Sequence, residues 1–132
     1  MASIQKEITV NATIEQVWEA MRDIGALHTR LVPGFVVGTK LELGARVVTF
    51  ANGRVVRERI VTIDDGAHRL VWSGTGDLLT HHNASAQILG DPDGRTRIIW
   101  IADLLPDSAA GAIDQMMDHG MTAMRTALEG LT

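Results

Sequence analysis

The segment DSAAGAIDQMMDHGMTAMRTALEGL, residues 107–131, is typical of one long amphipathic helix. Asp107 or Ser108 can cap its first turn, and its polar residues gather on the side opposite a broad apolar stripe. His119 falls among the polar residues, so we expect it to be solvated. The stripe consists of Ile113, Met116, Met117, Gly120, Met121, Met124 and Leu128.

The residues before this segment predict one strand, two short helices and then six strands. The first strand covers residues 3–10, and the first helix covers residues 11–25 with Asn11 or Thr13 as its N-cap. A second short helix covers residues 26–35. The turns between the later strands are short, so neighbouring strands are expected to be antiparallel. These strands cover residues 35–42, 45–50, 54–63, 69–74, 80–89 and 96–105.

An antiparallel sheet of seven strands must curl, and its apolar face needs a cover. The C-terminal helix is the only predicted element that is long enough to supply it. We therefore expect an α+β fold in which a curved seven-stranded sheet wraps around the C-terminal helix. With 132 residues, the chain is expected to form a single domain, residues 1–132.

His82, in the segment THHNASAQIL (80–89), shares its alternating phase with the apolar residues of that strand. Since successive side chains of a strand point to opposite faces, His82 is expected to point inward and His81 outward. The same alternation places Trp72 and Trp100 on the inward face.

The hairpin formed by the third and fourth strands leaves two registers open. A two-residue Asn-Gly loop would pair Val48 with Arg57 and bury an arginine. A loop of residues 52–54 would instead pair Val48 with Glu58, with Arg46 on the diagonal. We prefer the second register, because only there does the buried charge have a partner.

Charged residues are rarely buried without a partner, so the interior is expected to be hollow rather than solid. Small residues such as Gly74 would leave space on the sheet, and methionines suit a wall that adapts to different guests. A cavity of several hundred cubic ångström is therefore expected. Its expected lining is Arg46, Val48, Phe50, Glu58, Trp72, His82, Ala84, Trp100, Met117, Met121 and Met124.

The composition argues against several functional classes. A net charge of −4 with scattered basic residues argues against a nucleic-acid partner, and no apolar run is long enough for membrane insertion. The absence of cysteine and of a secretory pattern at the N-terminus fits a cytoplasmic protein. Adjacent strand residues point apart, so the His81-His82 pair predicts no metal site, and no cofactor is expected. The arginines of the outer sheet face leave a homodimer possible.

Four segments together resemble the START-like, or SRPBCC, superfamily in their order and spacing. They are ITVNATIEQVWEAMRD (8–23), GARVVTFANGRVVRERIVTIDD (44–65), RLVW (69–72) and GRTRIIW (94–100). The resemblance covers nearly the whole chain and implies a helix-grip fold with an apolar cavity between sheet and helix. Relatives of this kind include polyketide cyclases, lipid-transfer proteins and plant hormone receptors, and in the receptors a glutamate corresponding to Glu58 lines the pocket.

Three functional hypotheses follow. In the first, the chain binds a small apolar or amphipathic molecule in its cavity. In the second, it is a polyketide cyclase or dehydratase-like enzyme in which Glu58 and His82 act as acid and base. In the third, it regulates a protein partner and has no small-molecule ligand. Against the first two stands a purely structural role for Glu58 and His82, bonded to Arg46, water or backbone.

Overall fold

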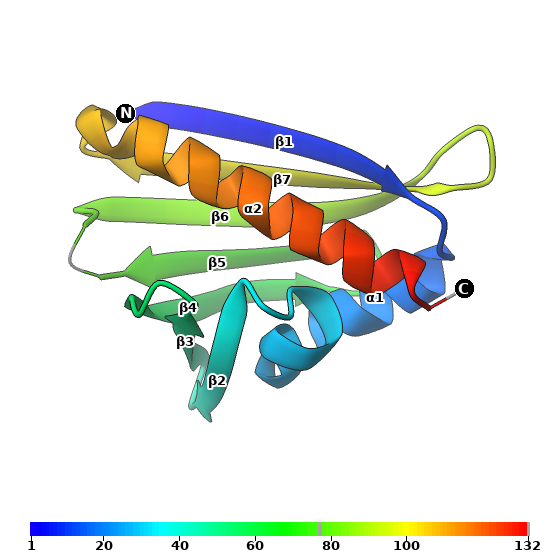
Figure 1. The fold of residues 1–132 in the computed structure, drawn as a ribbon, viewed down its shortest axis with the longest axis horizontal. Helices are drawn as coiled ribbons and strands as arrows, with labels where there is room; N and C mark the ends of the chain where they lie inside the picture. The colour runs from blue at the N-terminus through cyan, green and yellow to red at the C-terminus, as the bar shows by residue number, and fades with distance from the viewer. Residues whose placement is uncertain (77, 132) are drawn as a thin grey trace.

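A computed structural model describes residues 1–76 and 78–131. In these residues, a seven-stranded antiparallel sheet curves around the long C-terminal helix (Figure 1), with the strand order β1-β7-β6-β5-β4-β3-β2. The predicted α+β architecture is confirmed. The strands are β1 (Ala2–Val10), β2 (Val36–Glu42), β3 (Ala45–Phe50), β4 (Val55–Asp64), β5 (Arg69–Thr75), β6 (His81–Gly90) and β7 (Thr96–Leu105). The helices are α1 (Ile14–Arg22), η1 (Ile24–Ala26), η2 (Leu27–Leu31), η3 (Asp107–Ala109) and α2 (Ala110–Glu129).

Helix α1 begins at a complete capping box. The Thr13 hydroxyl accepts a hydrogen bond from the Gln16 backbone N–H at 3.1 Å, and the Gln16 side chain accepts one from the Thr13 N–H at 3.0 Å. This reciprocal pair satisfies two backbone groups that a helix start leaves open, which explains why the helix begins after Thr13 rather than after Asn11. The second predicted helix is present as two single turns, η1 and η2.

Helix α2 starts later than the sequence predicts and has no side-chain cap. Asp107 and Ser108, the two predicted caps, lie in the turn η3, and the N-cap residue is Ala109. The 3₁₀ turn η3 already forms a backbone hydrogen bond at this point, since the Ala109 N–H donates to the Pro106 carbonyl at 3.0 Å.

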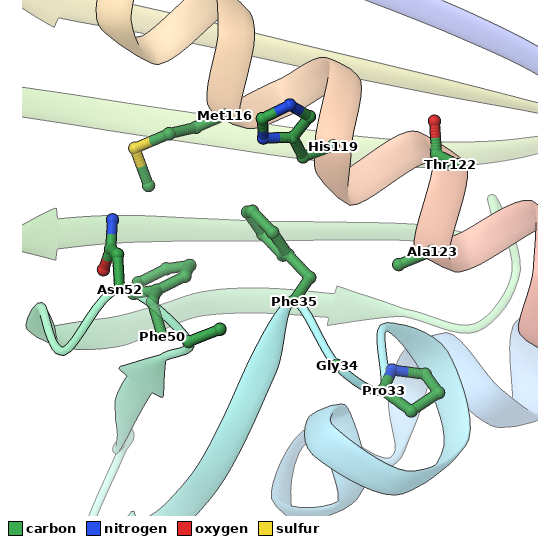
Figure 2. Close-up of a pocket in the computed structure, with 10 residues that line it drawn as sticks. Pro33, Gly34, Phe35, Phe50, Asn52, Met116, His119, Thr122 and Ala123 are labelled. Carbon is green, nitrogen blue, oxygen red and sulfur yellow. The ribbon is translucent and has the colours of Figure 1, made fainter.

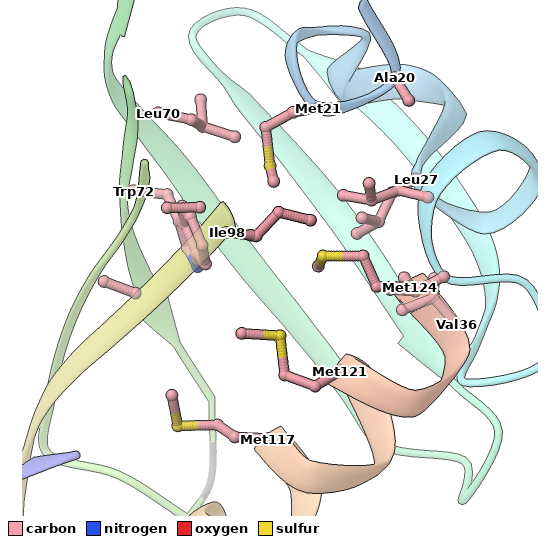
Figure 3. Close-up of a cluster of buried hydrophobic side chains, with 14 of the residues drawn as sticks. Ala20, Met21, Leu27, Val36, Leu70, Trp72, Ile98, Met117, Met121 and Met124 are labelled. Carbon is pink, nitrogen blue, oxygen red and sulfur yellow. The ribbon is translucent and has the colours of Figure 1, made fainter. Parts of the chain in front are cut away.

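The apolar stripe of α2 packs against the concave face of the sheet. Figure 3 shows its methionines directed toward Trp72 and Ile98. On the polar side, Nζ of Lys6 on β1 lies 2.8 Å from Asp114 and 3.0 Å from Asp118, which ties the helix to the edge strand. The buried residues of the helix are Ile113, Met117, Gly120, Met121, Met124 and Leu128.

The β3–β4 hairpin adopts a register that neither predicted loop gives. Its loop covers residues 51–53, Val48 lies opposite Val56, and Arg46 lies directly opposite Glu58. The preferred register, with Val48 opposite Glu58, is therefore wrong by two residues. Because side-chain direction repeats every two residues, this slip keeps Arg46 and Glu58 on the inward face. It also places the two charges closer together than expected.

Candidate functional site

A buried ion pair lies on the concave face of the sheet. Nε of Arg46 donates to Oε1 of Glu58 at 2.8 Å, and the two residues are only 3% and 6% exposed. Arg46 Nη1 also donates to the backbone oxygen of Ile24 at 3.4 Å, and its guanidinium carbon lies 5.7 Å from the ring centre of Trp72. Charges removed from water need such partners. The predicted partnership of Arg46 and Glu58 is confirmed.

The ion pair begins a row of residues that crosses the sheet at one level. Glu58 on β4 lies opposite Gly74 on β5. His82 on β6 lies on the other side of that glycine, since a Cβ built on Gly74 would stand 2.6 Å from Nδ1 of His82. Glu58 and His82 are thus two strand spacings apart, about 10 Å between backbones. Because Gly74 has no side chain, the His82 ring can lie over it, on the side of β5 that faces Glu58.

His82 points into the interior as expected and is half-buried, whereas His81 is exposed. Burial lowers the pKa of the His82 imidazole, and the nearby charge of Glu58 acts in the opposite direction. A neutral imidazole offers one hydrogen-bond donor and one acceptor. His82 is therefore suited to contact a polar group or to accept a proton at neutral pH.

Two small cavities lie between the sheet and α2. One, of about 60 Å³, is bordered by Arg46 and Glu58; the other, of about 70 Å³, is bordered by Glu58 and His82. We call them the inner cavities. The expected cavity of several hundred cubic ångström is not present as one enclosed space in the residues described. The aromatic side chains that line both inner cavities are Phe35, Phe50, Trp72 and Trp100.

A larger hollow of about 460 Å³ opens at the surface, between α2 and the adjoining ends of β2 and β3 (Figure 2). We call it the outer groove. The rings of Phe35 and Phe50 meet edge to face there, with their centres 5.3 Å apart. These two rings also line both inner cavities, so they form the boundary between groove and interior. The rest of the groove is lined by Pro33, Gly34, Ala51, Asn52, Met116, His119, Thr122 and Ala123.

Most of the residues expected to contact a ligand line the inner cavities. Val48, Ala84 and Met121 are the exceptions: they are buried in the core, outside the walls of these two spaces. Ala84 lies between Trp72 and Ala102 across the sheet ladder, which gives it a packing role. The residues that do line the cavities are Arg46, Phe50, Glu58, Trp72, His82, Trp100, Met117 and Met124.

Sequence reasoning missed Phe35, whose ring reaches the outer groove and both inner cavities. The predicted short helix of residues 26–35 ended on this aromatic residue, so no site was assigned to it. A signal was available: Phe35 follows Pro33-Gly34, a helix stop, at the point where the chain enters the edge strand of the sheet.

Outside the interior, the polar contacts mainly join neighbouring elements. The indole N–H of Trp18 donates to Asp65 at 2.8 Å, and Arg22 pairs with the same carboxylate, which fixes α1 to the β4–β5 turn. Within residues 1–76 and 78–131, no group of three acidic, histidine or cysteine side chains is placed to hold a metal ion. No helix in that part of the chain is long and apolar enough to cross a membrane.

Solved structures of several bacterial proteins share this fold. The protein XoxI from Bacillus cereus aligns with a TM-score of 0.87 at 18% identity, over 99% of this chain and 98% of the other. A START superfamily protein from Mycobacterium smegmatis aligns with a TM-score of 0.77 at 13% identity, over 98% and 99%. The Zhui aromatase/cyclase from Streptomyces sp. R1128 aligns with a TM-score of 0.74 at 15% identity, over 98% and 92%. These identities are low, so the likeness concerns the fold.

The sequence comparisons agree with the fold. No curated protein matches the chain significantly in sequence. The family model for polyketide cyclase / dehydrase and lipid transport proteins, in contrast, matches residues 1–132. The START-like resemblance of the sequence is confirmed, and the helix-grip fold with it. The chain belongs to the polyketide cyclase / dehydrase and lipid transport family.

Proposed function

We propose that the chain binds a small apolar or amphipathic molecule between the sheet and α2, with a polar group of that molecule near the Arg46–Glu58 pair. The observation that carries this proposal is the buried ion pair at the wall of the mainly apolar 60 Å³ cavity, with Glu58 reaching the 70 Å³ cavity as well. Two apolar side chains in place of Arg46 and Glu58 would fill the same part of the interior without the desolvation of two charges. The family supports a ligand-binding or cyclase-type function in general terms.

The inner cavities are small for an organic guest. An apolar cavity of about 150 Å³ is known to accept benzene, whereas these spaces measure about 60 and 70 Å³. A ring-sized guest therefore requires Phe35 and Phe50 to turn aside, which joins the cavities to the outer groove. Phe50 and Phe35 lie at the rim and are half-buried, so solvent-side space is available for that rotation.

Isothermal titration with indane, an uncharged bicyclic hydrocarbon, tests this proposal. We expect wild-type protein to bind indane and Ala86→Val to lose most of the affinity, because Ala86 lines the 60 Å³ cavity and the added methyl groups fill it. Ile98→Val is the matched control: Ile98 is fully buried but borders neither inner cavity. Absence of indane binding to the wild type, or equal binding by Ala86→Val, would contradict internal binding.

A second candidate is an enzyme of the cyclase or dehydratase type. The observation that favours it is the placement of Glu58 and His82 on either side of one cavity, with the pKa of His82 lowered by burial. In such a reaction His82 would serve as the base that takes a proton from carbon next to a carbonyl. Glu58, held by Arg46, would orient the substrate.

Hydrogen exchange distinguishes the enzyme from the binding protein. For 2-indanone in D₂O, an enzyme of this type would speed deuterium uptake at the carbons beside the carbonyl, and His82→Gln would abolish that acceleration. The rate should fall as the pH drops through the pKa of His82, since the base becomes protonated. Indane binding without any acceleration of exchange would leave the binding function alone.

A further inference from the structure

Trp100 holds a buried hydrogen-bond donor that nothing in the described part of the chain satisfies. Its side chain extends from β7 into the interior and lines both inner cavities. Nε1 of Trp100 is buried and has no hydrogen-bond partner among the described residues. Trp18, in contrast, donates its indole N–H to Asp65 at 2.8 Å. A buried N–H without a partner is unfavourable, so a phenyl ring would fill the same space without that penalty.

The indole is held in one position by its surroundings. A Cβ built on Gly120 of α2 would stand 2.9 Å from Cζ3 of Trp100 and 3.2 Å from the ring of Phe35. The helix therefore has a glycine where the far edge of the indole ring meets it. The ring of Trp72 lies on another side, with the two centres 6.4 Å apart. These contacts on two sides restrict rotation of the indole ring.

Arg54 lines the 70 Å³ cavity in addition to Glu58 and His82, whereas the charged residues at the wall of the 60 Å³ cavity are Arg46 and Glu58. Arg46 and Glu58 neutralise each other, and burial favours the uncharged form of His82 by lowering its pKa. A carboxylate entering the 60 Å³ cavity would bring in a charge whose nearest cation, Arg46, is already paired with Glu58, which is strongly unfavourable in an apolar interior. A hydrocarbon would leave the Trp100 N–H unsatisfied. An uncharged oxygen acceptor avoids both penalties.

We infer that Trp100 is a specificity-determining residue, whose Nε1–H donates a hydrogen bond to an uncharged oxygen acceptor of the bound molecule, such as a ketone or ester carbonyl. The inference rests on the proposed function, since it concerns a guest of the same cavities. It adds a neutral indole donor to the polar groups of the 60 Å³ cavity, which Trp100 shares with the Arg46–Glu58 pair.

Three matched probes test the inference by calorimetry: indane, 1-indanone and indane-1-carboxylate. We expect wild-type protein to bind 1-indanone more tightly than indane, and indane-1-carboxylate more weakly than either. Trp100→Phe removes the donor and keeps an aromatic ring. It should weaken 1-indanone binding about 3- to 10-fold, the worth of one neutral hydrogen bond, and change indane binding by less than about twofold on the same scale.

Nuclear magnetic resonance of the unaltered protein covers the case in which Trp100→Phe does not fold. The ¹H resonance of the Trp100 indole N–H should move downfield when 1-indanone is added and should not when indane is added. An equal response to both probes, an equal loss of both affinities in Trp100→Phe, or tighter binding of the carboxylate would overturn the inference while leaving internal binding in place. If neither indane nor 1-indanone binds the wild type, the proposed function fails, and this inference fails with it.

Discussion

The two halves of the interior are filled in different ways, although one sheet and one helix enclose both. In the half of the interior where α1 packs, the aliphatic side chains are almost completely buried, with exposed fractions of 0–1%. This closed end consists of Val10, Val17, Ile88, Ile98 and Leu128. At the other half the same concave face carries the cavity region, which consists of Arg46, Glu58, Trp72, His82 and Trp100.

The difference arises from side-chain volume and charge rather than from backbone shape. Ile88 lies directly opposite Ile98, and together they fill the space between β6 and β7 at the closed end. Farther along the same two strands, Ala84 lies opposite Ala102, and on β5 Gly74 makes room for the His82 ring to lie over it. A protein that needed only stability could have continued the aliphatic packing. The cavity region gives up packing and keeps polar groups.

The largest expected effect on this contrast comes from Glu58→Gln. It leaves the buried Arg46 without a counter-charge, which should lower the free energy of unfolding by about 3–5 kcal/mol. Replacing both partners by apolar residues, Arg46→Met with Glu58→Leu, should restore most of the stability, because the buried pair is replaced rather than broken. Urea unfolding measures both variants.

The double variant also separates function from structure. If the pair contacts the ligand, Arg46→Met/Glu58→Leu should bind 1-indanone more weakly than the wild type does, although its fold is stable. A stable double variant that binds 1-indanone as well as the wild type would show that the pair has only a structural role.

A smaller effect distinguishes two neighbouring alanines on β6. Ala84 is packed between Trp72 and Ala102, so Ala84→Val should overpack the core and destabilise it by about 1–3 kcal/mol. Ala86 lines the 60 Å³ cavity, so Ala86→Val should raise stability by about 0.5–2 kcal/mol. Thermal unfolding of the two variants gives the sign of each change. The same sign at both positions would contradict the position of the cavity.

At the closed end, Ile98→Val should lower stability by about 0.5–1.5 kcal/mol, the usual effect of one methyl group removed from a full core. Because Ile98 lies outside the walls of the inner cavities, the affinity for indane should stay unchanged. A parallel loss of stability and affinity would mean that the two halves are not independent.

The smallest effect is expected from pH, since solvent still reaches part of the His82 ring. Burial lowers the pKa of His82 below its ordinary value of 6.5, so the unfolded chain takes up a proton on this residue before the folded chain does. Above pH 6.5 the imidazole is neutral in both states, and the shift does not affect the free energy of unfolding. As the pH falls from 6.5 through the pKa of the folded state, the free energy of unfolding decreases.

His82→Gln provides the comparison for that titration. Urea unfolding at a series of pH values gives the unfolding free energy of the wild type minus that of the variant. This quantity should decrease as the pH falls below 6.5. Glu58, His81, Arg54 and Asp103 also act on His82, and they are present in both proteins. If the wild-type value minus the variant value increased toward acid pH, the direction of the pKa shift would be contradicted.

The architecture could be predicted from the sequence because it depends on two periodicities, the alternation of the strands and the apolar stripe of the helix. The alternation around His82 and Trp100 identified the inward face, and the apolar stripe of residues 107–131 identified the helix that covers it. Side-chain direction tolerates an error of two residues, which is why Arg46 and Glu58 were placed inward although the hairpin register was wrong. The register itself depends on the conformation of the loop at residues 51–53, which alternation does not encode.

The sequence was not sufficient for the size of the cavities. Small residues such as Gly74 were expected to leave space, but other side chains occupy it. The His82 ring lies over Gly74, and large rings from distant segments fill part of the remaining volume. Phe35 directly precedes β2 and Phe50 ends β3, and the contact between their rings exists only once the sheet is formed. Volume in a core depends on how all side chains fit together, and it is not a sum over one strand.

The most direct test of internal binding is a nuclear Overhauser measurement between indane and ¹³C-labelled methionine methyl groups. Met21 and Met124 line one inner cavity and Met117 lines the other, whereas Met116 also borders the outer groove. We expect cross-peaks from indane to Met21, Met117 and Met124. Cross-peaks to Met116 alone, or to no methionine, would place indane outside the interior and contradict the proposed binding site.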